Sequence, residues 1–83
     1  MRIWLGNLPY DMHELWLRMI FAPYHAELSK IEIKCPPRIY ADSSEWRAEA
    51  IVEVDDRERG LFAMAYIGGA QMGSKRINIK EVP

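Results

Sequence analysis

Hydrophobic and polar residues alternate along three stretches of the chain, which is typical of strands that bury one face. In the first stretch, Ile3 and Leu5 share one face and Arg2 and Trp4 share the other. Gly6-Asn7 follows, and we expect this pair to break the strand because glycine and asparagine favour turns.

The second stretch, residues 31–35, alternates isoleucine with charged side chains and predicts that Cys35 points into the core. Pro36-Pro37 ends it, since proline cannot donate to a sheet ladder. In the third stretch, residues 47–54, one face carries only apolar side chains: Ala48, Ala50, Val52 and Val54. A shorter run at residues 77–80 predicts a final strand.

Apolar residues at helical spacing predict a helix after each of the first and third strands. The first helix carries a stripe of Leu17, Ile20, Phe21 and Tyr24. Asp11 with Glu14 has the spacing of a capping box, and Pro23 predicts that the helix bends or ends near that residue.

The second helix is expected from Asp55, which has Glu58 three residues on, to Ile67, with Gly68-Gly69 at its end. We expect its core-facing side chains to be Leu61, Phe62, Met64 or Ala65, and Ile67.

The resulting order is β-α-β-β-α-β, an α+β ferredoxin-like sandwich. It places two helices on one face of a four-stranded antiparallel sheet and leaves the other face open to solvent. We expect residues 1–83 to form a single domain, because so short a chain cannot bury two cores.

Composition fits a packed domain: 49% of the residues are hydrophobic and 28% are charged. Eleven basic and twelve acidic residues give a net charge of −1, which argues against strong non-specific nucleic-acid binding but not against binding through one face. With one cysteine and no apolar run of about 20 residues, we expect an intracellular, cytoplasmic protein, with the nucleus as an alternative. Met1 leads directly into a strand, so we expect no leader segment and a nearly complete small protein.

The hexamer Ile3-Trp4-Leu5-Gly6-Asn7-Leu8 resembles the first-strand motif of the RNA-recognition-motif (RRM) family, which reads aliphatic, aromatic, aliphatic, Gly, Asn, Leu. Residues 47–54 stand where the family carries its octamer, K/R-G-F/Y-G/A-F-V-x-F/Y. Residues 17–24 are similar to the family's first-helix pattern, and residues 63–79 to its second helix and closing hairpin. The resemblance implies a module that binds single-stranded RNA on its open sheet face.

The octamer departs from the family pattern at its two base-stacking positions, which hold Glu49 and Ile51. Two missing stacking platforms cost about 2–6 kcal/mol of binding free energy. Trp4 remains as one platform, and Trp46 and Tyr40 are candidates for others.

The remaining candidate RNA-binding residues are polar. We expect Arg2, Arg47 and Lys34 to hold the RNA backbone, and Asn78 and Lys80 to contact base edges or phosphate. Because Glu32, Glu49 and Glu53 share the predicted open face, its charge is mixed rather than strongly positive.

The alternative is a protein-interaction or homodimerisation module on the same scaffold, with Trp4 and Ile51 at the centre of an interface on the sheet. A third possibility is an interaction through the helix face, to which Trp16 contributes. No set of residues suits catalysis or a cofactor, a capped helix explains Asp11 and Glu14 without a metal, and no membrane partner is expected.

Overall fold

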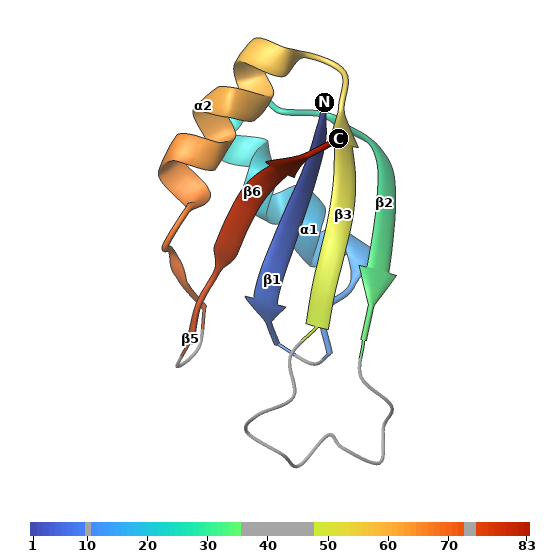
Figure 1. The fold of residues 1–83 in the computed structure, drawn as a ribbon, viewed down its shortest axis with the longest axis vertical. Helices are drawn as coiled ribbons and strands as arrows, with labels where there is room; N and C mark the ends of the chain where they lie inside the picture. Colours follow the sequence, from blue (N-terminus) through green and yellow to red (C-terminus); the bar gives the residue numbers. More distant parts are fainter. Residues whose placement is uncertain (10, 36–47, 73–74) are drawn as a thin grey trace.

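The computed structural model describes residues 1–9, 11–35, 48–72 and 75–83 of the chain. Its main element is an antiparallel sheet of four strands in the order β2-β3-β1-β6. The strands are β1 (Arg2–Leu8), β2 (Leu28–Lys34), β3 (Ala48–Val54) and β6 (Asn78–Val82). Figure 1 shows both α-helices on the same side of this sheet, so the predicted ferredoxin-like sandwich is confirmed.

The helices and a small hairpin connect these strands. They are α1 (Glu14–Phe21), the 3₁₀ turn η1 (Ala22–Tyr24), α2 (Arg57–Ile67), β4 (Gln71–Met72) and β5 (Lys75–Arg76). The α1 helix ends at Phe21, two residues before Pro23, and the next three residues form the 3₁₀ turn η1. This agrees with the end or bend that Pro23 predicts. No helix among the described residues is long and apolar enough to cross a membrane.

The core lies between the sheet and the helices and follows the predicted alternation. Ile3, Leu5 and Val52 are fully buried on the helix-facing side, where they meet Leu17 and Phe21 of α1. Each fully buried side chain of this size contributes about 1.5–3 kcal/mol to folding. The first strand is longer than predicted, because β1 runs through Gly6-Asn7 to Leu8 with an irregularity after Leu5.

Both helix starts differ from the predicted capping boxes. The N-cap of α1 is His13, with no side-chain cap, so the Asp11 prediction is wrong. The N-cap of α2 is Asp56 rather than Asp55, and its carboxylate accepts a hydrogen bond from the Arg59 amide at 3.2 Å. An acidic pair at residues 55 and 56 supplies the same chemistry at either position, and only the backbone path selects one.

The buried face of α2 is also different from the predicted one. Ile67 faces the core as predicted, and Met64 packs partly buried against it. The other core-facing residues are Gly60 and Ala63, whereas Leu61 and Phe62 are 45% and 46% exposed. A Cβ at residue 60 would overlap the sulfur of Met1, so the small residues let α2 lie close against the start of the sheet. Cys35 is exposed rather than buried, and its thiol lies 3.5 Å from the Met12 carbonyl oxygen.

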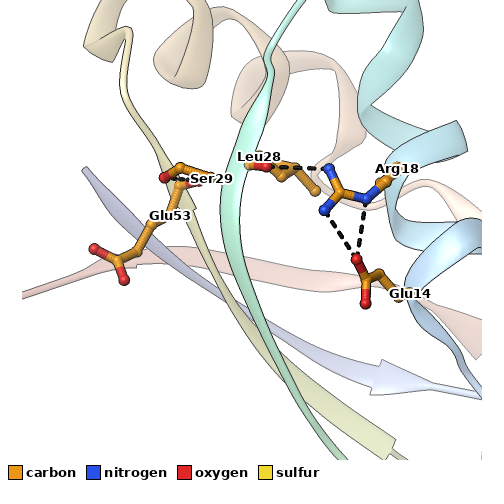
Figure 2. Close-up of polar contacts among 5 residues, drawn as sticks. All are labelled: Glu14, Arg18, Leu28, Ser29 and Glu53. Atoms are coloured by element: carbon orange, nitrogen blue, oxygen red, sulfur yellow. Dashed lines mark hydrogen bonds and ion pairs between the residues drawn. The ribbon is translucent and has the colours of Figure 1, made fainter.

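Arg18 joins α1 to the start of β2 (Figure 2). Its guanidinium donates to Glu14 Oε1 at 3.2 and 2.9 Å and to the Leu28 carbonyl oxygen at 3.1 Å. On the neighbouring strand pair, the Ser29 hydroxyl donates to the Glu53 carbonyl oxygen at 3.3 Å. The bond from Arg18 to Leu28 ties β2 to α1, and the bond from Ser29 ties β2 to β3.

Candidate RNA interface on the open sheet face

The centre of the open sheet face is a row of four side chains, one from each strand. Trp4 on β1 pairs with Lys80 on β6 and with Ile51 on β3, and Ile51 pairs in turn with Glu32 on β2. Residues directly opposite in antiparallel strands have Cβ atoms about 4.5–5.5 Å apart and lie on the same face. The register therefore places an aromatic ring at the centre of the surface that the helices leave uncovered.

Gly6 determines how the Trp4 side chain lies on this surface. A Cβ at residue 6 would overlap the six-membered ring of the indole, so the ring lies directly above the Gly6 backbone. The Lys80 ammonium lies over the same ring, with Nζ 5.1 Å from the centroid. This distance is within the range of about 6 Å for a cation–π interaction. Trp4 is thus half-buried, in contact with Gly6 of its own strand and with Lys80 of β6.

Basic and acidic residues alternate across the remaining rows of the face. Glu53 lies between Arg2 and Lys30 in the register, and Glu49 lies opposite Lys34. Lys30 Nζ also lies 3.6 Å from Glu32 Oε1. Because each β3 carboxylate has a basic residue beside it, its negative potential toward a bound phosphate is reduced.

A shallow depression of about 290 Å³ lies along β2 and β3. Its lining includes Lys34, Glu49 and Ile51. Ile51, one of the lining residues, is the register partner of Trp4. The depression therefore lies on the same sheet face as Trp4, over β3, the strand next to β1.

Asn7 has a structural role that the sequence interpretation missed. Its backbone is left-handed, with φ 62°, and its side-chain amide donates to the Arg76 carbonyl oxygen at 2.8 Å. This bond ties the end of β1 to the β4–β5 hairpin. Asparagine adopts the left-handed region more readily than most residues. The Gly-Asn pair was therefore the signal in the sequence that could have indicated a left-handed backbone at residue 7. On β6, Asn78 is exposed and pairs with Gly6, beside the indole.

Arg57 and Glu81 form an exposed ion pair between α2 and β6, away from the Trp4 row. The Arg57 guanidinium donates to both carboxylate oxygens, one at 3.0 Å. The hydrogen bond from Arg57 lowers the pKa of Glu81, and the same bond raises the pKa of Arg57. The pair fastens α2 to the final strand.

The structure brings most of the predicted RNA-binding residues to one surface, with Arg2 at its rim, where Nη1 donates to the Pro83 carbonyl oxygen at 3.0 Å. Those on the open face are Arg2, Trp4, Lys34, Glu49, Ile51, Asn78 and Lys80. Tyr40, Trp46 and Arg47 lie outside the described residues. Within the described part of the chain, no three His, Cys, Asp or Glu side chains are grouped so as to hold a metal ion.

Comparison with solved structures gives the same fold. The first two RRM domains of the yeast poly(U) binding protein Pub1 match with TM-score 0.77 at 20% identity, over 96% of this chain and 44% of that one. The Rna15 RRM with bound RNA (GU) matches with TM-score 0.76 at 20% identity, over 98% and 81%. The C. elegans NONO-1 homodimer matches with TM-score 0.71 at 20% identity, over 95% and 27%.

The chain therefore has the fold of an RNA-recognition motif, as its first-strand hexamer predicts. The chain spans less than half the length of the Pub1 structure and about a quarter of the NONO-1 chain. No family model matches the sequence, and no curated protein matches it.

Proposed function

We propose that this chain is a non-catalytic module that binds single-stranded RNA on the open face of its sheet. The observation that carries the proposal is the position of Trp4, whose indole lies over Gly6 at the centre of that face with Lys80 beside it. Stacking of one base on an aromatic ring contributes about 1–3 kcal/mol. The similarity to the Rna15 RRM, which has bound RNA (GU), supports the same use of the fold.

In the proposed complex, one base stacks on Trp4. This base takes the place of the Lys80 ammonium over the indole. The displaced ammonium then contacts a neighbouring phosphate of the RNA. Asn78, which pairs with Gly6 beside the ring, donates to or accepts from the edge of that base. A second nucleotide lies in the depression along β2 and β3, near Lys34.

The number of aromatic stacking platforms and the charge of the face set the expected strength of RNA binding. Glu49 and Ile51 supply no aromatic platform, so one described ring stacks a base where the family motif has three positions. We therefore expect micromolar affinity for short RNA that falls as salt rises. A cytoplasmic or nuclear location, where RNA is present, fits this function and is part of the proposal.

The decisive experiment is an NMR titration of the ¹⁵N-labelled chain with a pool of random single-stranded RNA hexamers. We expect the amides of Trp4, Ile51 and Lys80 and the Trp4 indole N–H to shift, while Tyr66 on α2 does not. Trp4→Ala should weaken binding about 5- to 150-fold, whereas Tyr66→Ala, which removes an exposed aromatic on the other side, should not. A folded domain whose Trp4 signals do not move with RNA would refute the proposal.

Homodimerisation through the sheet is the second candidate, and one register pair favours it. Trp4 and Ile51 are adjacent and half-buried, and charged residues surround them, as in an interface core and rim. Analytical ultracentrifugation distinguishes the two functions. A concentration-dependent dimer that Trp4→Ala disrupts would favour dimerisation, and a monomer at all concentrations would exclude it.

A further inference from the structure

The largest exposed apolar side chains of the described residues lie on the helices and not on the sheet. They are Leu15, Met19, Leu61, Phe62 and Tyr66. Tyr66, the second-last residue of α2, is an aromatic residue that is 62% exposed. Grouped exposed apolar residues of this kind mark a binding surface more often than isolated ones do.

Three aromatic rings on this side form what we call the aromatic cluster: Tyr24 on η1, and Phe62 and Tyr66 on α2. The Tyr24 and Tyr66 rings are stacked, with centroids 5.8 Å apart. Phe62 lies 4.8 Å from Tyr66 and 6.1 Å from Tyr24, centroid to centroid. The cluster is thus a preformed apolar surface with two hydroxyl groups, and binding to it requires little ordering of side chains.

A groove of about 600 Å³ lies between the end of α1, the start of β2 and the residues that precede α2. We call it the acidic groove. It is lined by Arg18, Ala22, His25, Ala26, Glu27, Leu28, Asp55 and Asp56. Its volume is in the range of about 300–1,000 Å³ that is usual for ligand sites.

The charge of the groove is negative because its arginine is already neutralised. Arg18 is bound to Glu14 and to the Leu28 carbonyl oxygen, as Figure 2 shows. Glu27, Asp55 and Asp56 are the lining carboxylates, and of these Asp56 already accepts the capping hydrogen bond of α2. Arg57 and Arg59 follow directly in the chain, but neither lines the groove, and Arg57 is bound to Glu81. An RNA phosphate would be repelled here, and a cation would be attracted.

Two segments of the chain link the cluster to the groove. Tyr24 of the cluster directly precedes His25, which lines the groove. Along α2, Phe62 lies six residues beyond Asp56, which is about 9 Å at 1.5 Å per residue. An extended peptide of three or four residues spans this distance.

We propose that the helix side of the domain binds a basic segment of a partner protein. An aromatic or long aliphatic side chain of that segment lies on the aromatic cluster, and an arginine three or four residues away enters the acidic groove. Arginine fits better than lysine because its planar guanidinium binds carboxylates in pairs and stacks on tyrosine rings. The surface is opposite Trp4, so it does not depend on the proposed RNA-binding function, and RNA and partner can bind together.

The test uses the full chain and three synthetic 12-residue peptides in glycine-serine sequence. The first peptide carries two arginines, a spacer of three residues and one tryptophan. The second has glutamate in place of both arginines, and the third has alanine in place of the tryptophan. We expect saturable shifts of Tyr24, Asp55 and Phe62 amides with the first peptide alone, and unchanged Trp4 signals.

Variants then separate the two parts of the surface. Phe62→Ala and Asp55→Asn should each weaken the first peptide's binding about fivefold or more. Asp55 is chosen because Asp56 caps α2. Leu61→Ala on the same helix is the matched control. Leu61 is exposed but belongs to neither the aromatic cluster nor the acidic groove, so its truncation should not change the affinity. Dispersed spectra of all three variants verify that the domain remains folded.

Several results would overturn the proposal. They are the absence of saturable shifts, equal binding of the glutamate peptide, and shifts centred on Trp4. Concentration-dependent self-association that Phe62→Ala abolishes would also overturn it, because the occupant would then be a second copy of this chain.

Discussion

The six-membered ring of Trp4 fills the space that a side chain at residue 6 would occupy. Of the two residues, the glycine sets the orientation of the tryptophan, because only a residue without a Cβ lets the indole lie flat along β1. Gly6 and Trp4 are two positions of the RRM-like hexamer, and their contact gives the pattern a physical reason.

Gly6→Ala should displace the indole without unfolding the domain. The added methyl group overlaps the ring, so Trp4 must adopt another rotamer, at a cost of about 1–3 kcal/mol of overpacking. We expect the Trp4 indole N–H signal to move in an NMR spectrum and RNA affinity to fall, while the Trp16 indole signal remains in place. An unchanged Trp4 signal would contradict the described contact.

Glu49→Phe should strengthen RNA binding. The substitution places an aromatic ring at one of the octamer's two stacking positions, and one stack contributes about 1–3 kcal/mol, or roughly 5- to 150-fold in affinity. Glu49→Gln removes only the charge, so its gain should be smaller and should shrink as salt rises. Fluorescence anisotropy with a labelled RNA hexamer measures both. Equal gains from the two variants would show that residue 49 does not stack a base.

Asn7→Ala should destabilise the domain more than Asn7→Gly does. Asn7→Ala loses the hydrogen bond to Arg76 and forces alanine into the left-handed region, for a total of about 1.5–3.5 kcal/mol. Asn7→Gly loses only the hydrogen bond, about 0.5–1.5 kcal/mol. Urea unfolding of the two variants gives the difference. Equal losses would indicate that the backbone at residue 7 carries no strain.

The Arg57–Glu81 pair should stabilise the domain at neutral pH and not in acid. The hydrogen bond from Arg57 lowers the pKa of Glu81 in the folded state, so folding is favoured above the ordinary glutamate pKa of about 4.3. This contribution is lost as the pH falls through the lowered pKa. The stability difference between the native chain and Glu81→Gln, measured by thermal unfolding, should therefore shrink in acid. It should also shrink in high salt, because the pair is exposed.

Phe21→Ala and Phe62→Ala should have very different effects on stability. Phe21 is fully buried, so its truncation should cost about 3–5 kcal/mol. Phe62 is half-exposed and loses only contacts within the aromatic cluster, about 1 kcal/mol. Chemical denaturation measures both. A loss from Phe62→Ala as large as that from Phe21→Ala would mean that Phe62 belongs to the core.

Local patterns in the sequence predicted much of the fold. The alternation that begins at Arg2 and the alternation at residues 47–54 identified two central strands and their buried faces, because a strand turns successive side chains to opposite sides. The glycine pair after Ile67 marked the end of α2, and Pro23 marked the end of α1. These features depend on residues close together in the chain.

Other features depended on contacts between distant residues. Hydrophobicity alone favoured Leu61 and Phe62 as core residues of α2. The close approach of the helix to Met1 instead selected Gly60 and Ala63. Cys35 is exposed because it follows the last residue of β2, where the sheet no longer dictates the alternation.

For the candidate site, the sequence by itself determined which residue types are available: one aromatic in the hexamer, two non-aromatic residues in the octamer, and basic residues on the neighbouring strands. Only the tertiary structure decided that the Trp4 ring lies over Gly6, that Lys80 covers it, and that Glu53 stands between Arg2 and Lys30. The physical reason is that cross-strand register joins residues up to about eighty positions apart, and no periodicity within one strand specifies that register.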